Sequence, residues 1–210
     1  IFGIAWNAYS DARPGNIVLL GTILLGTGLL DFGHMLGYRG MPDFVTPSSP
    51  QKAIVFWMGA RYLVAAGLLA AALRPWQPML SARSRYRVLT GVLGYVGALY
   101  AIELFYPAQL PIFFIRGLGL TPLKIALEYG LVAIYGLAAV AFYLQARTRP
   151  SFNANDLFIA SGIALLSELF FTQYASVSDI YNFAGHLYKI ISYAFIFRAV
   201  FVDSVHQPIH

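Results

Sequence analysis

The chain contains no cysteine, and only 11% of its 210 residues are charged. The missing cysteine excludes disulfides, thiolate metal sites and thiol nucleophiles from this stretch. The scarcity of charge goes with a hydrophobic content of 59% and a mean hydropathy of +0.66, values beyond those of ordinary globular domains. The composition therefore excludes a soluble domain and predicts a polytopic membrane protein.

Several functional motifs are also absent. The sequence has no G-x-S-x-G or H-E-x-x-H motif and no phosphate-cradling loop, so we expect no catalytic role. It shows neither inverted repeats nor pairs of broken helices, which argues against transport. A small transporter or intramembrane enzyme, with buried carboxylates as a proton relay, is the less favoured alternative.

Six apolar segments are long enough to cross a bilayer, which takes about 20 residues. They are residues 16–37, 52–73, 88–106, 121–145, 156–174 and 180–202. A seventh, residues 1–8, is too short to span at about 1.5 Å per residue, and it begins without methionine, so we expect further residues before Ile1. The predicted fold is an all-α polytopic transmembrane helical bundle of about seven helices, the first truncated, forming one domain over residues 1–210.

Basic residues predict the orientation of this bundle, because Lys and Arg accumulate in cytoplasmic loops. They gather in two loops on one side: Arg74, Arg83, Arg85, Arg87, Arg147 and Arg149. We expect these loops and the C-terminus to be cytoplasmic. The formal net charge of +5 is then a topology signal, and we expect no nucleic-acid partner. Residues 107–122, too apolar for a free loop and too glycine-rich for a stable helix, are predicted to form a lid or re-entrant piece outside.

Ionisable residues gather toward the outer end of the predicted helices. They are Asp31, His34, Arg61, Glu103, Glu128, Glu168, Asp179 and His186. A charge inside a membrane is costly and marks function by default. Stabilisation of a bundle alone does not require all of them in one leaflet. We therefore predict a polar cavity that opens outward.

Two of these positions are histidines with polar neighbours on the same helix face. Asp31 and His34 are three residues apart, and Asn182 and His186 are four apart, so each pair shares a face. Their depths are comparable, so one ligand can touch both histidines. The alternative is that the histidines only bridge helices by hydrogen bonds, as polar residues do in lipid.

The glutamates allow two interpretations as well. Glu103, Glu128 and Glu168 can line the cavity, or they can pair inside the bundle with Arg61, Lys124 or Lys189, because an unpartnered buried carboxylate is costly. Aromatic residues make up 16% of the chain, and most of those in the outer half are expected in the interfacial belt or in packing. Trp57 is included among the expected ligand contacts.

Four separated stretches carry a family resemblance. They are residues 31–41 (DFGHMLGYRGM), 117–124 (GLGLTPLK), 167–174 (SELFFTQY) and 179–189 (DIYNFAGHLYK). Together, and with the last helix running to Val205, they resemble the third type of bacterial membrane-associated sensor domain of the MASE group. Met35 and Arg39 depart from the residues expected for this pattern at their positions.

The resemblance implies an integral-membrane input module at the N-terminus of a signalling protein in the bacterial inner membrane. Such modules are followed by a cytoplasmic diguanylate cyclase, phosphodiesterase or histidine kinase region, often through a PAS domain. Residues 203–210 would then lead toward the effector. The last helix, which connects the predicted pocket to that exit, is the expected output element. A homodimer is expected through the effector region, with membrane lipid as the other partner.

We expect the ligand site to include Asp31, His34, Trp57, Arg61, Glu103, Glu128, Glu168, Asp179, Asn182, His186 and Lys189. One hypothesis is a small polar or amphipathic ligand, held by charge at Arg61 and Lys189 and by hydrogen bonds at the histidines. A second is a haem between His34 and His186. A third is a divalent metal such as Zn or Cu, bound by the two histidines with Asp31, Glu168 or Asp179.

Overall fold

The computed structural model describes residues 1–10, 13–79, 81–115, 117–148, 152–173 and 180–205. In these residues six helices are long and apolar enough to cross a membrane, which confirms the all-α polytopic bundle. The helices are α1 (Phe2–Asn7), α2 (Gly15–Gly37), α3 (Pro50–Leu73), α4 (Ala82–Phe105), α5 (Pro122–Thr148), α6 (Phe152–Phe171) and α7 (Ile180–Val205). The short α1 packs beside α2.

The helices extend past several of the predicted boundaries. The predicted 88–106 segment begins at Ala82, so α4 includes three arginines ahead of the apolar run. Similarly, α5 continues to Thr148 and α6 begins at Phe152, before the predicted Asp156. Long basic side chains keep their charge in water while their stems cover apolar surface, so a helix can continue beyond its apolar run. An apolar window therefore underestimates helix length.

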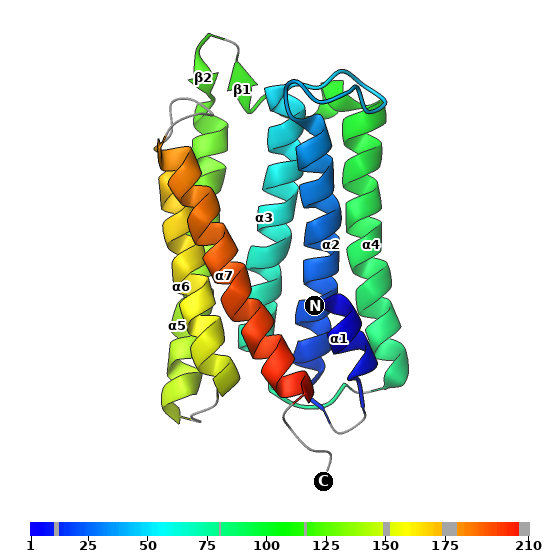
Figure 1. The fold of residues 1–210 in the computed structure, drawn as a ribbon, viewed down its shortest axis with the longest axis vertical. Helices are drawn as coiled ribbons and strands as arrows, with labels where there is room; N and C mark the ends of the chain where they lie inside the picture. Colours follow the sequence, from blue (N-terminus) through cyan, green and yellow to red (C-terminus); the bar gives the residue numbers. More distant parts are fainter. Residues whose placement is uncertain (11–12, 80, 116, 149–151, 174–179, 206–210) are drawn as a thin grey trace.

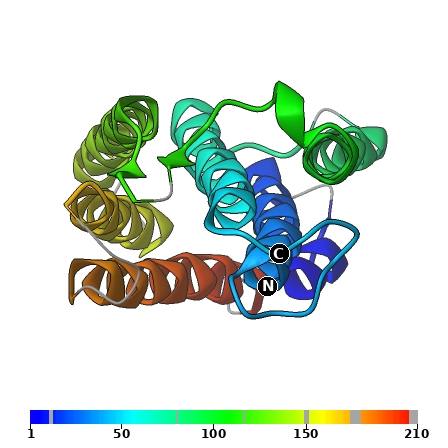
Figure 2. The same ribbon diagram turned by 90° about the horizontal axis from the view of Figure 1, so that it is seen from above.

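The long helices form two groups. Helices α1 to α4 make one group and α5 to α7 the other, and the groups meet where α3 packs against α5. Figure 2 shows α3 and α2 at the centre, α5 and α6 on one side and α4 on the other. Helix α7 crosses the bundle at an angle, from beside α6 at one end to α1 at the other (Figure 1).

The two ends of the bundle differ in character. One end, called here the hairpin end, carries the loop between α2 and α3 and the short antiparallel strands β1 (Phe114–Ile115) and β2 (Gly119–Leu120). The other, called here the basic end, carries Arg74, Arg83, Arg85, Arg87 and Arg147. Helix α7 begins at the hairpin end and ends at the basic end (Figure 1).

Residues 107–122 form a surface hairpin, and their described part does not re-enter the bundle. The 3-10 turn Pro107–Gln109 is followed by the two strands, which project from the end of the bundle (Figure 1). Gln51 at the start of α3 fastens this segment, because its Nε2 donates to Pro111 O at 2.9 Å and its Oε1 accepts from Phe113 N at 2.8 Å. The hairpin is thus attached to α3.

Glycines determine how closely several helices approach. A Cβ on Gly185 of α7 would lie 2.6 Å from Cζ of Phe171 on α6, so the ring packs directly on the α7 backbone. On α2, the space that a Cβ would take is filled by Ala5 at Gly21 and by Val92 and Leu63 at Gly26. By contrast, a Cβ on the α4 glycines would meet nothing within 4 Å: Gly91, Gly94 and Gly97.

We predict that Gly185→Ala destabilises the protein. The new methyl group would overlap the Phe171 ring, and overpacking of this kind costs about 1–3 kcal/mol. The measurement is thermal unfolding in detergent, beside Gly91→Ala on α4, where the methyl group has open space. Equal unfolding temperatures for the two variants would contradict the tight α6–α7 contact.

Candidate functional site

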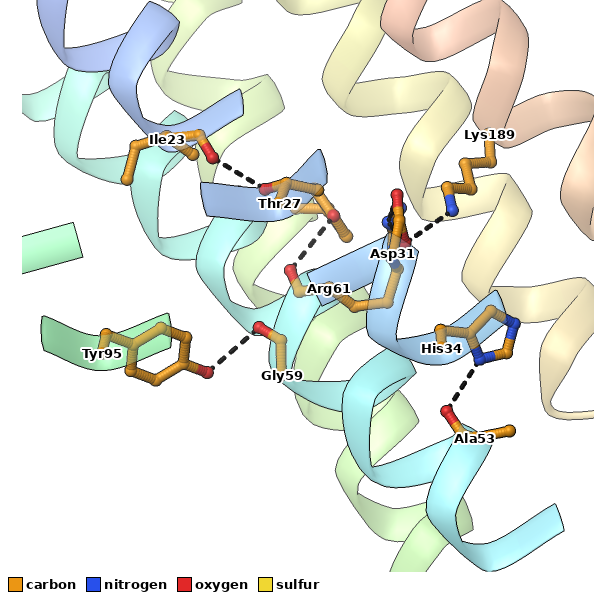
Figure 3. Close-up of polar contacts among 10 residues, drawn as sticks. Ile23, Thr27, Asp31, His34, Ala53, Gly59, Arg61, Tyr95 and Lys189 are labelled. Carbon is orange, nitrogen blue, oxygen red and sulfur yellow. Dashed lines mark hydrogen bonds and ion pairs between the residues drawn. The ribbon is translucent and has the colours of Figure 1, made fainter. Parts of the chain in front are cut away.

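The candidate site centres on Asp31, which connects three helices. Its carboxylate on α2 accepts from Arg61 Nη2 of α3 at 3.1 and 3.2 Å. It also accepts from Lys189 Nζ of α7 at 3.0 Å (Figure 3). Arg61 is 2% exposed, Lys189 14% and Asp31 25%, so two nearly buried cations share one partly accessible anion.

Two aromatic side chains enclose the cations. The Arg61 guanidinium carbon lies 4.7 Å from the Trp57 ring centroid and 5.3 Å from that of Tyr193. Lys189 Nζ lies 4.7 Å from the Trp57 centroid and 5.7 Å from that of Tyr193. Attraction of a cation to an aromatic face strengthens where water is excluded, so these rings partly replace the hydration that Arg61 has lost.

The two histidines both pack against Trp57. Ring centroids are 5.4 Å apart for His34 and 5.2 Å for His186. His34 Nδ1 lies 2.7 Å from Ala53 O (Figure 3) and His186 Nδ1 lies 2.8 Å from Asn182 O. A carbonyl oxygen only accepts, so each Nδ1 carries the proton. In the neutral imidazole each Nε2 is then left as an acceptor.

The glutamates have different environments. Glu128 forms an ion pair with Lys124 one helical turn away, as the pairing hypothesis allows. Glu168 is 2% exposed, and its Oε2 has no hydrogen-bond partner among the described residues. Arg61, Lys124 and Lys189 lie within electrostatic reach of Glu168. Glu103 is 4% exposed on α4, and Lys52 is the cation acting on it.

These residues fall into one main cluster and two outlying sites. Asp31, His34, Trp57, Arg61, His186 and Lys189 touch one another directly or through Trp57. Glu128 lies on α5 and Glu168 on α6, and Glu103 lies apart on α4. Asn182 contributes its carbonyl to His186. Asp179 lies outside the described residues.

The geometry bears on the haem and metal hypotheses. Among the described residues, which do not include Asp179, no three His, Asp or Glu side chains come close enough to hold a metal ion. The bonding of each Nδ1 to a carbonyl resembles that of metal-ligating histidines. However, a haem held by both imidazoles would have to share its space with the indole of Trp57, which contacts both rings.

Sequence reasoning missed contacts that fix α7 to α6. Ser167 Oγ donates to Gly185 O at 2.7 Å, and Ser192 Oγ donates to Ala160 O at 2.8 Å. Arg198 forms an ion pair with Asp156 near the basic end. Tyr193 was also missed, although its spacing of four residues from Lys189 places both on one helix face. Such spacing reveals neighbours on one helix, whereas contacts to another helix need the fold.

Lys189 connects the two groups of helices. Of the ion pairs among the described residues, Lys189–Asp31 alone joins the α5–α7 group to the α1–α4 group. Other contacts between the two groups start from α3: Tyr62 Oη donates to Leu127 O of α5 at 2.8 Å, and the Arg61 guanidinium lies against the Tyr193 ring of α7. A change at Asp31 or Lys189 thus acts on the position of α7 relative to α2.

Comparison with known proteins gives a match that covers nearly the whole chain. The family model MASE3, described as a membrane-associated sensor domain, matches residues 1–208. No curated protein and no solved structure matches the chain.

We predict that Asp31→Asn destabilises the protein, because it leaves Arg61 and Lys189 without their shared anion. Removing one partner from a fully buried ion pair costs about 3–5 kcal/mol, and the 25% exposure of Asp31 should place the loss below that range. The measurement is the unfolding free energy in detergent. Asp43→Asn, at an exposed loop acid, is the matched control and should be neutral, because the amide oxygen can still accept from Ser48 N as Asp43 Oδ1 does at 3.2 Å.

A double-mutant cycle separates the pair from the individual side chains. Lys189→Met should cost less than Asp31→Asn, since Asp31 keeps Arg61. The double variant should lose less than the sum of the two, because the second change removes a group already unpaired. Strict additivity would mean that the contact between α2 and α7 contributes nothing.

Proposed function

Since the chain belongs to the MASE3 family of membrane-associated sensor domains, its role is sensory input, and we propose a site and a route for the signal. The site is the Asp31 cluster at the hairpin end, where a small ligand binds. The route is α7, which carries the change to the basic end. There it drives a cytoplasmic diguanylate cyclase or histidine kinase region.

The ion pair between Lys189 and Asp31 is the observation that carries this proposal. It joins the two helix groups at the hairpin end, and it lies on the helix that runs to the basic end. Helix α7 is otherwise fixed to α6 by Ser167, Ser192 and Arg198. A change in this one contact can therefore shift α7, together with α6, against α2 and α3.

Two states of the contact provide the switch. In one, Lys189 pairs with Asp31, and in the other a bound ligand separates them. A ligand shifts such an equilibrium only through its differential affinity for the two states. A ligand that supplies its own anion to Lys189, or its own donor to Asp31, binds the separated state more tightly than the paired state. The partial exposure of Asp31 supports access from outside the cluster.

The orientation is part of the proposal. The arginines at the basic end favour a cytoplasmic location for that end under the positive-inside rule. Helix α7 ends there, so an effector that follows it would lie in the cytoplasm of a bacterial inner membrane. The open glycines of α4 provide a surface for close helix approach in a homodimer, which the effector region would also hold together.

The haem and metal hypotheses stay predictions, and the observation in their favour is that neither Nε2 has a hydrogen-bond partner among the described residues. They are tested by an optical spectrum and elemental analysis of the purified protein beside His34→Ala and His186→Ala. A Soret band or bound metal that both variants lose would establish a cofactor sensor. A colourless, metal-free protein would favour the organic ligand proposed here.

The route through α7 predicts a periodic effect of insertions. Residues 1–205, fused in continuous helix to a diguanylate cyclase domain, should give a basal cyclic-di-GMP output that changes when one residue is inserted after Val202. Each inserted residue rotates the effector by about 100°. Insertion of about seven residues, close to two helical turns, should return the output toward its original value. The readout is cyclic-di-GMP in isolated membranes.

The same fusion tests the switch itself. Lys189→Met should move the basal output away from the wild-type value, and Asp31→Asn should move it in the same direction. Asp43→Asn should leave it unchanged. An output that is insensitive to both changes at the ion pair would contradict the proposed route, whatever the ligand is.

A further inference from the structure

A surface pocket lies beside the Asp31 cluster, at the hairpin end of α2. Its volume is about 430 Å³, and it is lined by His34, Met35, Tyr38, Arg39, Gly40 and Met41. It is a shallow depression that is open to the outside, so a ligand there would keep part of its surface outside the protein. The last turn of α2 supplies one wall, and the turn in which Met41 N donates to Tyr38 O at 3.1 Å supplies the other.

The lining combines one cation with apolar side chains. Arg39 is exposed and has no ion pair or hydrogen bond among the described residues. This distinguishes it from Arg61, which is buried and already bonded to Asp31. Met35 is 52% exposed, Tyr38 41% and Met41 38%, so two thioethers and a phenol ring make up most of the exposed wall, beside His34 and Gly40. An available guanidinium beside apolar surface suits an anionic head with an apolar body.

The apolar surface continues from the pocket along the membrane-spanning part of α2. Met35, Phe32 and Leu29 are 52%, 51% and 38% exposed and recur every three residues, so they follow one side of the helix. A chain attached to a head at Arg39 can therefore lie along α2 in the bilayer.

From this placement we propose that the pocket binds a membrane-partitioned amphiphile with an anionic head, the head at Arg39 and the chain along Met35 and Phe32. His34 connects this pocket to the ion cluster. It lines the pocket, bonds to Ala53 O, packs on Trp57 and lies one turn from Asp31. The binding site itself stands on the pocket alone. Its effect on signalling rests on the proposed function.

The experiment is photo-crosslinking of the full chain in phosphatidylcholine nanodiscs. The probe is a fatty acid with a diazirine on its chain, and labelled peptides are identified by mass spectrometry. We expect saturable labelling at Phe32 or Met35. Unlabelled oleate, which has one chain and a carboxylate head, or phosphatidylglycerol, which has two chains and a phosphate head, should compete with the probe. Comparison of the two competitors shows whether the bound head is a fatty-acid carboxylate or a lipid phosphate. Competition by oleate alone, by phosphatidylglycerol alone or by both would support the proposal.

Variants of Arg39 test the anion contact. Arg39→Gln should weaken labelling by about tenfold, the value of a hydrogen bond to a charged group, whereas Arg39→Lys should retain most of it. Arg87→Gln, at an exposed arginine of the basic end, is the matched control and should not change labelling. A melting temperature equal to that of the wild type shows that Arg39→Gln is folded, as expected for an exposed side chain without a partner.

Three results would overturn the proposal. Labelling that is equal in wild type and Arg39→Gln would exclude the anion contact. Competition by oleyl alcohol equal to that of oleate would show that the head charge is not recognised. Competition by inorganic phosphate equal to that of oleate would show that the apolar chain is not recognised. Absence of saturable labelling in the wild-type protein, with an Asp31-dependent output intact, would end this inference and leave the proposed function standing.

Discussion

The shared anion at Asp31 is the constraint on which the outer half of this bundle depends. Two cations from different helices, Arg61 and Lys189, point at one carboxylate. Without it they would face each other in a setting poor in water, where repulsion and lost hydration are both large. The carboxylate therefore determines how α2, α3 and α7 can approach at the hairpin end.

The aromatic residues lower the cost of burying the two cations in a membrane. Trp57 contacts both cations and both histidines, and the Tyr193 ring also lies against both cations. The cluster is thus closed toward the bundle and partly open at Asp31 and His34. Glu168 adds a further buried carboxylate within electrostatic reach of Arg61 and Lys189.

The membrane spans and most of the candidate site residues could be predicted from the sequence, because the patterns that indicate them are local. Apolar runs gave the six spans, and the scarcity of charge made each ionisable residue conspicuous. The shared faces of Asp31 with His34 and of Asn182 with His186 follow from helical spacing. The helix ends at Ala82 and Thr148 were missed because apolarity stops before the helix does.

The partners across helices could not be predicted, because they depend on packing. Asp31 and Lys189 are 158 positions apart, and no local pattern couples them. The sequence pointed to Glu103, Glu128 and Glu168 as partners for the bases, yet two of the bases pair with Asp31 instead. The fold also decides which arginine can bind a ligand anion. Arg39 and Arg61 are both arginines toward the same end of the bundle, and their sequence positions do not show that Arg61 is paired with Asp31 while Arg39 is exposed.

The most direct test of the account is the distance between α2 and α7 at the hairpin end. Because the chain has no cysteine, spin labels can be placed at Phe32→Cys and Phe183→Cys, both at exposed positions, and measured by pulsed electron resonance. With Lys189→Met the distance should increase or its distribution broaden, while a pair at Leu144→Cys and Phe197→Cys near the basic end should change less. An unchanged Phe32–Phe183 distance would contradict the claim that the Lys189–Asp31 ion pair sets the position of α7 relative to α2.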